Sequence, residues 1–190
     1  MRKLKLQMQL SVDGFVAGPK GEMDWMTWDM DDGISKYINT IIDTSDTILL
    51  GRKMTDGFVS HWENVVKNQP ESPEYTFAKK MVNTQKVVFS KTLETSKWEN
   101  TLLATGNIVD EINQLKQKPG KDILVYGGGD FVSSLINEAL IDEFHFFINP
   151  VIIGTGISIF KNVSEYQKLH LINTKGYECG ITVLHYKIQK

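Results

Sequence analysis

Short apolar segments alternate along this chain with segments of helical periodicity, and this alternation limits the possible folds more than any other feature. Residues 4–10 (LKLQMQL) alternate between apolar and polar side chains, which predicts a strand with one buried face. TILLG, KVVFS and DILVY are short apolar segments that predict buried strands, and a weaker strand is expected near 101–104. Strands that alternate with helices indicate an α/β fold with a mostly parallel sheet.

Helices are expected between these strands, at residues 31–43, 74–83, 108–117 and 131–140. The polar segment 63–75, which contains two prolines, is predicted to be a surface loop. Near the C-terminus, IDEFHFFINPVI predicts a strand that stops at Pro150, and two antiparallel strands are expected around Lys175-Gly176. This closing pair indicates that the sheet has an antiparallel edge.

The composition is that of a globular chain, and it argues against a nucleic-acid partner. The 190 residues are 41% hydrophobic, and this length is typical of one domain, predicted here to span 1–190. The 21 basic and 23 acidic residues leave a net charge of −2, so there is no basic excess to neutralise a phosphate backbone. We therefore expect no binding to nucleic acid.

Cysteine content and hydropathy predict a cytoplasmic protein without a membrane partner. Cys179 is the single cysteine, which excludes an internal disulfide and a multi-cysteine zinc site. The start, MRKLKLQMQLSVDG, lacks the apolar core of a signal peptide, and no run approaches the ~20 apolar residues that span a bilayer. The four histidines, His61, His145, His170 and His185, are scattered without ligand spacing, so no metal site is expected.

Two of the expected strands end in residues suited to binding an anion. ILLGRKM leads from one strand into Gly51, Arg52 and Lys53, and VYGGGDFVSSLINEAL leads from another through three glycines into a helix. Ligands of open α/β sheets bind beyond the carboxyl ends of strands, and a helix start preceded by glycines offers free N–H groups to a phosphate. Each segment alone could be a tight turn or a solvated helix start, and the G-x-G-x-x-G and Walker A spacings are absent. Their joint occurrence favours a nucleotide with phosphates at more than one place.

The order of these motifs resembles the dihydrofolate reductase fold, and more closely the reductase domain of the bifunctional riboflavin deaminase-reductase and its free-standing relatives. SVDGFVAG followed by Trp25 is similar to that domain's S-L-D-G-x-I-A opening and the Trp after a short loop. NPVIIGTGISIF, at 149–160, is similar to its P-x-x-x-G-x-G segment. The resemblance covers essentially the whole chain. It implies a three-layer α/β fold with a mixed, mostly parallel central sheet, an antiparallel C-terminal edge and helices on both faces.

The resemblance also implies NADPH as the cofactor, lying across the carboxyl edge of the sheet. The glycines after the fifth strand would cradle the pyrophosphate, and the cations after Gly51 would meet the phosphates. Ser90 and Lys91 match the segment beside the adenosine 2′-phosphate. The implied cofactor-binding residues are Val16, Ala17, Trp25, Gly51, Arg52, Lys53, Met54, Ser90, Lys91, Gly127, Gly128, Gly129, Asp130, Phe131 and Val132.

The activity that the resemblance implies is hydride transfer to a small heterocyclic or carbonyl substrate. Its named candidate is the reduction of 5-amino-6-(5-phosphoribosylamino)uracil in riboflavin biosynthesis. Deamination is excluded, because one cysteine cannot provide the P-C-x-x-C part of the zinc deaminase signature. The riboflavin branch is expected to carry an acidic residue just before the glycines, where this chain has Tyr126. This departure puts the substrate in doubt and favours one alternative, a nucleotide-binding module without turnover.

Three residues are candidates for a catalytic role: Asp29, Asp31 and Tyr126. Dihydrofolate reductase places a carboxylate on the helix after its flexible loop, which makes pterin reduction a second alternative here. The aspartates are more typical of a helix start, where they cap the helix or complement its dipole, than of a catalytic carboxylate. The interval from Asp31 to Gly51 also looks longer than the folate enzyme needs. The expected partners are a small-molecule substrate and, from family behaviour, a second copy in a homodimer.

Overall fold

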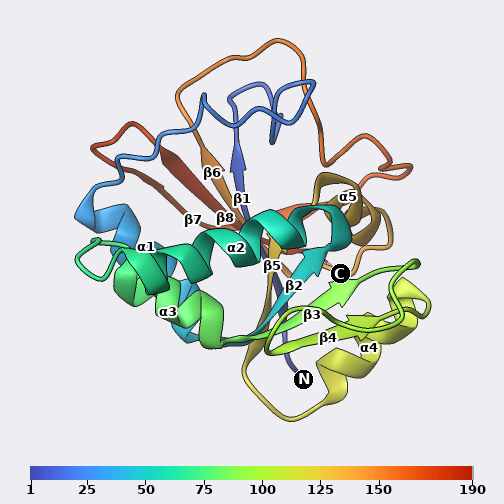
Figure 1. The fold of residues 1–190 in the computed structure, drawn as a ribbon. Coiled ribbons are helices and arrows are strands. Elements are labelled where there is room, and N and C mark those ends of the chain that lie inside the picture. Colours follow the sequence, from blue (N-terminus) through green and yellow to red (C-terminus); the bar gives the residue numbers. More distant parts are fainter. Residues whose placement is uncertain (190) are drawn as a thin grey trace.

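The computed structural model describes residues 1–189, and within them eight strands form one sheet with helices on both faces (Figure 1). The strand order is β4-β3-β2-β5-β1-β6-β8-β7. The strands β1 to β6 run parallel, whereas β8 is antiparallel to β6 and to β7. The strands are β1 (Leu4–Leu10), β2 (Ser45–Gly51), β3 (Gln85–Phe89), β4 (Thr101–Ala104), β5 (Asp122–Gly127), β6 (Glu143–Ile148), β7 (Leu169–Gly176) and β8 (Thr182–Ile188). The predicted α/β class with an antiparallel C-terminal edge is confirmed.

Two separate apolar clusters join the sheet to its helices, so the molecule has three layers. On one face, Ile34, Phe58 and Met81 bring three helices onto the sheet. On the other face, Ile112 and Leu135 do the same for two helices. The helices of the first face are α1 (Asp32–Asp43), α2 (Arg52–Asn68) and α3 (Tyr75–Asn83), and those of the second are α4 (Ile108–Gln117) and α5 (Gly129–Asn137). The three-layer arrangement implied by the resemblance is confirmed.

The alternating side chains of β1 divide between the two faces of the sheet. Leu4 and Leu6 belong to the cluster under α4 and α5. Lys5 points to the other face, where its ammonium donates to Thr44 Oγ1 just after α1, at 3.0 Å. Successive side chains of a strand lie on opposite faces, so β1 places a row of polar side chains on the α1 face.

Two element boundaries differ from those expected. The segment 63–75 is not all loop, because α2 continues to Asn68. Val65 lies on the inner side of this last part and is buried, which extends the helical packing beyond the point where the polar residues begin. The C-terminal turn does not lie at Lys175-Gly176, which are still paired in β7. The chain turns between Tyr177 and Ile181, where Gly180 adopts a φ of +89°.

Two long loops lie together beyond the carboxyl ends of β1 and β6. The first joins β1 to α1, and the second joins β6 to β7 (blue and orange at the top of Figure 1). Val16 donates its amide to the carbonyl of Ile157 at 2.9 Å, and the Ile157 amide donates to Ala17 at 2.8 Å. The Asp13 carboxylate also accepts the amide of Gly154 at 2.7 Å. These bonds make the two loops one structural unit above the sheet.

Candidate functional site

The two glycine-containing strand ends meet in the structure. Gly51 ends β2 and Gly128 follows β5, and these strands are neighbours in the sheet. A Cβ built on Gly51 would lie 2.9 Å from the Phe131 Cβ, and one built on Gly128 would lie 3.0 Å from the Gly51 Cα. No side chain could replace either hydrogen without moving backbone, so the close approach of two backbones is what requires these glycines.

The same two glycines are the N-caps of α2 and α5. No side chain of residues 1–189 makes a capping hydrogen bond at either helix start. Gly128 has a φ of +100°, and Gly127 before it has a φ of +146°, both in the region that favours glycine. Two helix N-termini therefore present free N–H groups and their positive dipole ends at the carboxyl edge of the sheet, an arrangement that suits an anion.

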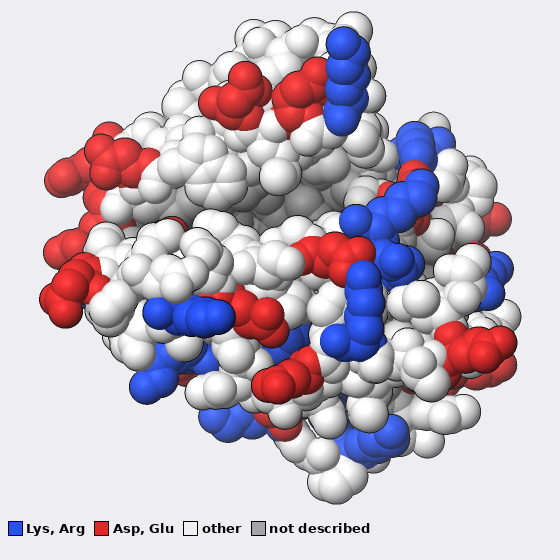
Figure 2. Space-filling view, in the orientation of Figure 1, with Lys and Arg blue, Asp and Glu red and all other residues white. Residues whose placement is uncertain are grey.

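Cationic side chains surround this pair of helix starts. Asp130, in the first turn of α5, is held by Lys53 at 3.3 Å and by Lys161 at 2.5 Å. The hydrogen bonds from Lys161 and Lys53 hold the pKa of the Asp130 carboxyl below its usual range. Figure 2 shows Lys and Arg side chains gathered at one side of a hollow that lies between the upper loops and the α2 layer.

Arg52 is oriented by its neighbours and keeps one donor free. Its Nη1 lies 3.2 Å from Asp56 Oδ2, and its guanidinium carbon is 5.5 Å from the centre of the Trp98 ring. Asp56 is fixed in turn by Lys97 at 2.8 Å and by the Trp98 indole N–H at 3.1 Å. Among the described residues, nothing accepts a hydrogen bond from the buried Arg52 Nε. A planar guanidinium held in this way suits a phosphate.

The paired loops cover the start of α5. A Cβ on Gly129 would lie 2.9 Å from Ile157 Cγ2 and 3.8 Å from Val16 Cγ2. Val16 and Ile157 therefore lie beside the glycine cradle, by which we mean Gly51 and residues 127–129, and Ala17 is bonded to Ile157. Sequence reasoning missed Ile157 and Lys161 as parts of this site. The segment 149–160 was the available signal, since it contains Ile157 and ends immediately before Lys161.

Other residues implied as cofactor contacts have local partners of their own. The Ser90 hydroxyl, after β3, accepts the amides of Thr92 and Leu93 at 3.2 and 3.1 Å, and Lys91 next to it is exposed. The Trp25 indole donates to the carbonyl of Glu22 at 3.1 Å.

Three further residues implied as cofactor contacts, Met54, Phe131 and Val132, lie near the cradle. The Met54 sulfur lies 2.9 Å from the place of a Gly127 Cβ. Phe131 packs its ring 4.8 Å from that of Phe89. Val132 is buried, and its amide donates to Gly128, which leaves the amides before it as the free donors of α5.

The three candidate catalytic residues occupy different environments. Asp31 is the N-cap of α1, where its carboxylate accepts the amides of Ile34 at 2.9 Å and Cys179 at 3.1 Å. These hydrogen bonds lower the pKa of the Asp31 carboxyl, and the bond from Ile34 has the largest effect. Asp29 is exposed in the loop before α1. Tyr126 packs its ring 5.4 Å from that of Phe58 on the α2 face, and burial raises the pKa of its phenol.

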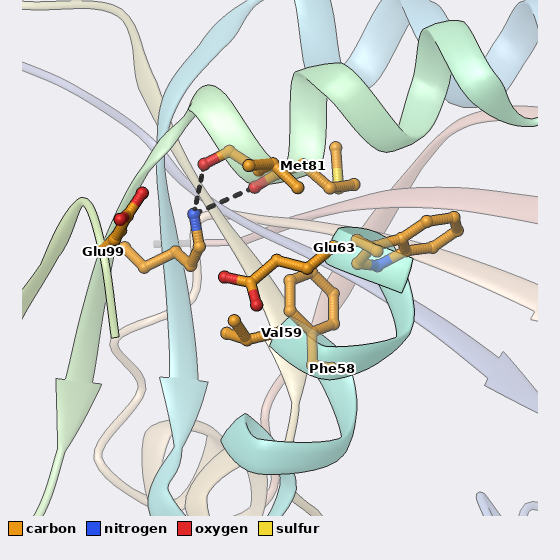
Figure 3. A pocket seen from close by; sticks show the side chains of 8 residues that line it. Phe58, Val59, Glu63, Met81 and Glu99 are labelled. Carbon is orange, nitrogen blue, oxygen red and sulfur yellow. Dashed lines mark hydrogen bonds between the residues drawn. The ribbon is translucent and has the colours of Figure 1, made fainter. Parts of the chain in front are cut away.

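A small pocket lies between α2, α3 and β3 (Figure 3), and the charged side chain in it is bonded to the protein itself. It contains Lys86, the second residue of β3, and so lies near the amino ends of the strands. The Lys86 ammonium donates to the carbonyls of Met81, Val82 and Thr84 at 3.0, 2.9 and 2.8 Å. All three of its donors have protein partners, so we assign this lysine to the C-terminus of α3 rather than to a ligand.

The sequence positions of the four histidines indicated that they were scattered, but the structure brings two of them together. His145 and His185 stack with ring centres 4.1 Å apart, next to Glu143. They come together because β6 and β8 pair with these two residues opposite each other. No helix in the described part of the chain is long and apolar enough to cross a membrane.

The fold defines a protein of the dihydrofolate reductase-like class, with two helix starts that lack side-chain caps at the carboxyl edge of its sheet. A model of the RibD C-terminal domain family matches residues 2–183, and the chain belongs to this family, the reductase of riboflavin biosynthesis. The family is a reductase family that generally uses NADPH.

The chain is also similar to individual proteins. The uncharacterized protein YyaP of Bacillus subtilis (strain 168) is 35% identical over 185 residues, covering 97% of this chain and 94% of that protein. A Shewanella sp. PV-4 protein named for riboflavin biosynthesis has a TM-score of 0.74 at 22% identity, with 100% of both chains covered. The Thermotoga maritima diaminohydroxyphosphoribosylaminopyrimidine deaminase/5-amino-6-(5-phosphoribosylamino)uracil reductase has a TM-score of 0.66 at 17% identity. That match covers 99% of this chain and 57% of the Thermotoga one. At these identities the two structures support the fold alone.

Proposed function

We propose that this protein is an NADPH-dependent reductase that transfers a hydride to a small heterocyclic or carbonyl substrate. The observation that carries the proposal is the meeting of Gly51 and Gly128, which brings two helix starts without side-chain caps to one point at the carboxyl edge. Two adjacent anion sites are what a dinucleotide with several phosphate groups requires. Membership of a reductase family supports the same reading.

Each part of the site has a role in this proposal. The amides at the start of α5 bind the pyrophosphate, and Arg52 and Lys53 at the start of α2 bind the 2′-phosphate. Val16 and Ala17, from the loop joined to Ile157, cover the nicotinamide end and keep water from the transferred hydride. NADPH, when bound, supplies the hydride itself. The protein's contribution is then position and a dry cavity.

The first test is cofactor affinity in the Arg52→Ala/Lys53→Ala double variant. NADPH should bind about tenfold more weakly, equivalent to about 1.4 kcal/mol, while NADH should change little, because only NADPH carries the 2′-phosphate. Calorimetry or cofactor fluorescence measures both. Lys79→Ala, an exposed lysine on α3, is the matched control. Equal losses for the two cofactors would remove this assignment, and no NADPH binding by the unaltered protein at millimolar cofactor would overturn the proposal.

The specific substrate that we propose is the ribosylaminopyrimidine of riboflavin biosynthesis. We also propose that the protein is located in the cytoplasm. Tyr126 favours one competing function, a binding module without turnover, because it replaces the expected acid with a phenol packed on Phe58. A panel of pyrimidine, pterin and carbonyl substrates separates these functions. NADPH affinity without oxidation of NADPH by any of them would support the module. We also propose a homodimer, which sedimentation measures directly.

A further inference from the structure

A second polar cluster lies on β6 and β8, away from the glycine cradle. Glu143 and His145 are two residues apart on β6, so their side chains share one face of the sheet. His185 lies directly opposite His145 in the antiparallel pair of β6 and β8. All three stand in the amino-terminal half of β6 or beside it, whereas the cradle lies beyond the carboxyl ends of β2 and β5.

One ligand atom of each of the three side chains lies close to those of the other two. Nε2 of His145 lies 3.9 Å from Glu143 Oε2, and Nε2 of His185 lies 3.6 Å from the same oxygen. Both distances exceed a hydrogen bond, and one ligand atom from each residue lies within 4.8 Å of the other two. The exposed fraction of His145 is 4%, so its Nε2 is aimed at a buried point.

Both imidazole Nε2 atoms are buried without a hydrogen-bond partner among the described residues. Buried polar atoms are paired in most proteins, and an unpaired one calls for an explanation such as an ion. Burial lowers the pKa of both imidazoles, that of His145 to about 3, with His185 as the next cause. A metal ion binds an imidazole nitrogen through the lone pair of its unprotonated form, and a buried Nε2 without a hydrogen-bond partner is placed to offer that lone pair.

Neighbouring groups orient the cluster as they do around bound metals. Tyr37 Oη lies 2.8 Å from His145 Nδ1, so a proton on Nδ1 leaves Nε2 with its lone pair free. Lys3 Nζ holds Glu143 Oε1 at 2.7 Å and leaves Oε2 toward the imidazoles. Lys5, which lies beside Glu143 in the pairing of β1 with β6, is paired with Asp122 at 2.8 Å. Lys3 and Lys5 thus each have a carboxylate partner, and Lys187, which lies opposite Glu143 in the pairing of β6 with β8, is exposed.

We propose that Glu143, His145 and His185 bind a divalent transition-metal ion, with Zn²⁺ as the probe. Two imidazoles and one carboxylate suit Zn²⁺, Ni²⁺ or Co²⁺, and they suit Mg²⁺ or Ca²⁺ poorly. Ligands bound to Zn²⁺ at about 2.1 Å in a tetrahedron are about 3.4 Å apart, so small side-chain rotations close the site. The bound ion would join β6 to β8 and keep a fourth position for water.

The test uses the full chain without an affinity tag, stripped with a chelator and titrated with Zn²⁺ by calorimetry. We expect one ion per chain, and a visible absorption spectrum of nitrogen-ligated Co²⁺ when Co²⁺ replaces Zn²⁺. His185→Asn and Glu143→Gln should weaken binding by at least tenfold, the range seen when even supporting groups of a metal site are lost. His170→Asn, at an exposed histidine of β7, is the matched control and should bind normally.

A measurement on the unaltered protein and a variant that keeps all three ligands complete the test. In the unaltered protein, Zn²⁺ should shift the NMR signals of the ring nitrogens of His145 and His185 and leave His61 and His170 unchanged. Tyr37→Phe keeps all three ligands and should weaken Zn²⁺ binding without abolishing it. The proposal is overturned if the stripped protein takes up no Zn²⁺, or if the signals that move belong to His61 or His170.

Discussion

At the scale of single residues, Lys86 shows how a charge can serve packing rather than binding. The residue is 2% exposed, and its ammonium donates to three carbonyls at the end of α3. Burial lowers its pKa, while Glu63 acts in the opposite direction. The last carbonyls of a helix have no partner within the helix, and a cation there also complements the dipole.

We therefore expect Lys86→Met to destabilise the protein by about 1–3 kcal/mol, the usual cost of leaving buried acceptors unpaired. Urea unfolding measures the change, and Lys79→Met, at an exposed lysine of α3, is the control. NADPH affinity should not change, because the pocket lies at the amino ends of the strands. A wild-type midpoint in Lys86→Met would show that water replaces the ammonium without loss.

The role of a residue can be predicted from the sequence when its contacts are with residues close by in the chain. Asp31 could be recognised as a helix start because an N-cap needs only the next few residues, and the structure places it there. The contact between His145 and His185 could not be predicted from the sequence. They are distant in the sequence, and only the register of β6 with β8 sets them opposite each other. Lys161 was hidden for the same reason, since a long loop brings it to Asp130.

At the scale of elements, α2 connects the proposed cofactor site to the rest of its layer. Gly51 precedes the helix, and Gly57 lies within it. The two glycines have different reasons to be there. A Cβ on Gly51 would meet Phe131 at 2.9 Å, whereas a Cβ on exposed Gly57 would have nothing within 4 Å. Glycine in a helix interior lowers stability relative to alanine.

Gly57→Ala should therefore stabilise the protein by roughly 0.5–1 kcal/mol, because alanine loses less backbone entropy on folding and meets no obstacle. Thermal and urea unfolding should both show the gain. Cofactor affinity should stay as it is, since position 57 is beyond the first turn of α2. An unchanged or lower stability would mean that this part of α2 is strained in a way that the geometry does not reveal.

Helices and strands were predictable where one hydrophobic pattern extends over the whole element. The period-two alternation of β1 and the short apolar cores of β2, β3 and β5 indicated strands that the structure confirms. The end of α2 was harder, because Val65 is one buried residue in a polar stretch next to two prolines. The last turn was placed too early, since Lys175-Gly176 resembles a turn but pairs within β7, and Gly180 supplies the positive φ.

At the scale of the whole molecule, the glycine cradle joins the layers. Gly51 leads into α2 on one face, and Gly128 leads into α5 on the other. The loop that contains Val16 is bonded to the segment after β6 and reaches over the same point. A ligand bound there would contact elements of both helical layers and both long loops, so its binding should oppose unfolding of all of them.

NADPH should accordingly raise the stability of the entire protein, by about 2.7 kcal/mol at a concentration one hundred times its Kd. Thermal unfolding followed by circular dichroism measures the rise. In Gly51→Ala the added methyl forces Phe131 or the Gly128 backbone to move, so NADPH should raise the unfolding temperature much less. Gly57→Ala should keep the full rise from its own higher baseline. If NADPH stabilises Gly51→Ala as much as the unaltered protein, the cofactor does not bind at the point where β2 and β5 meet.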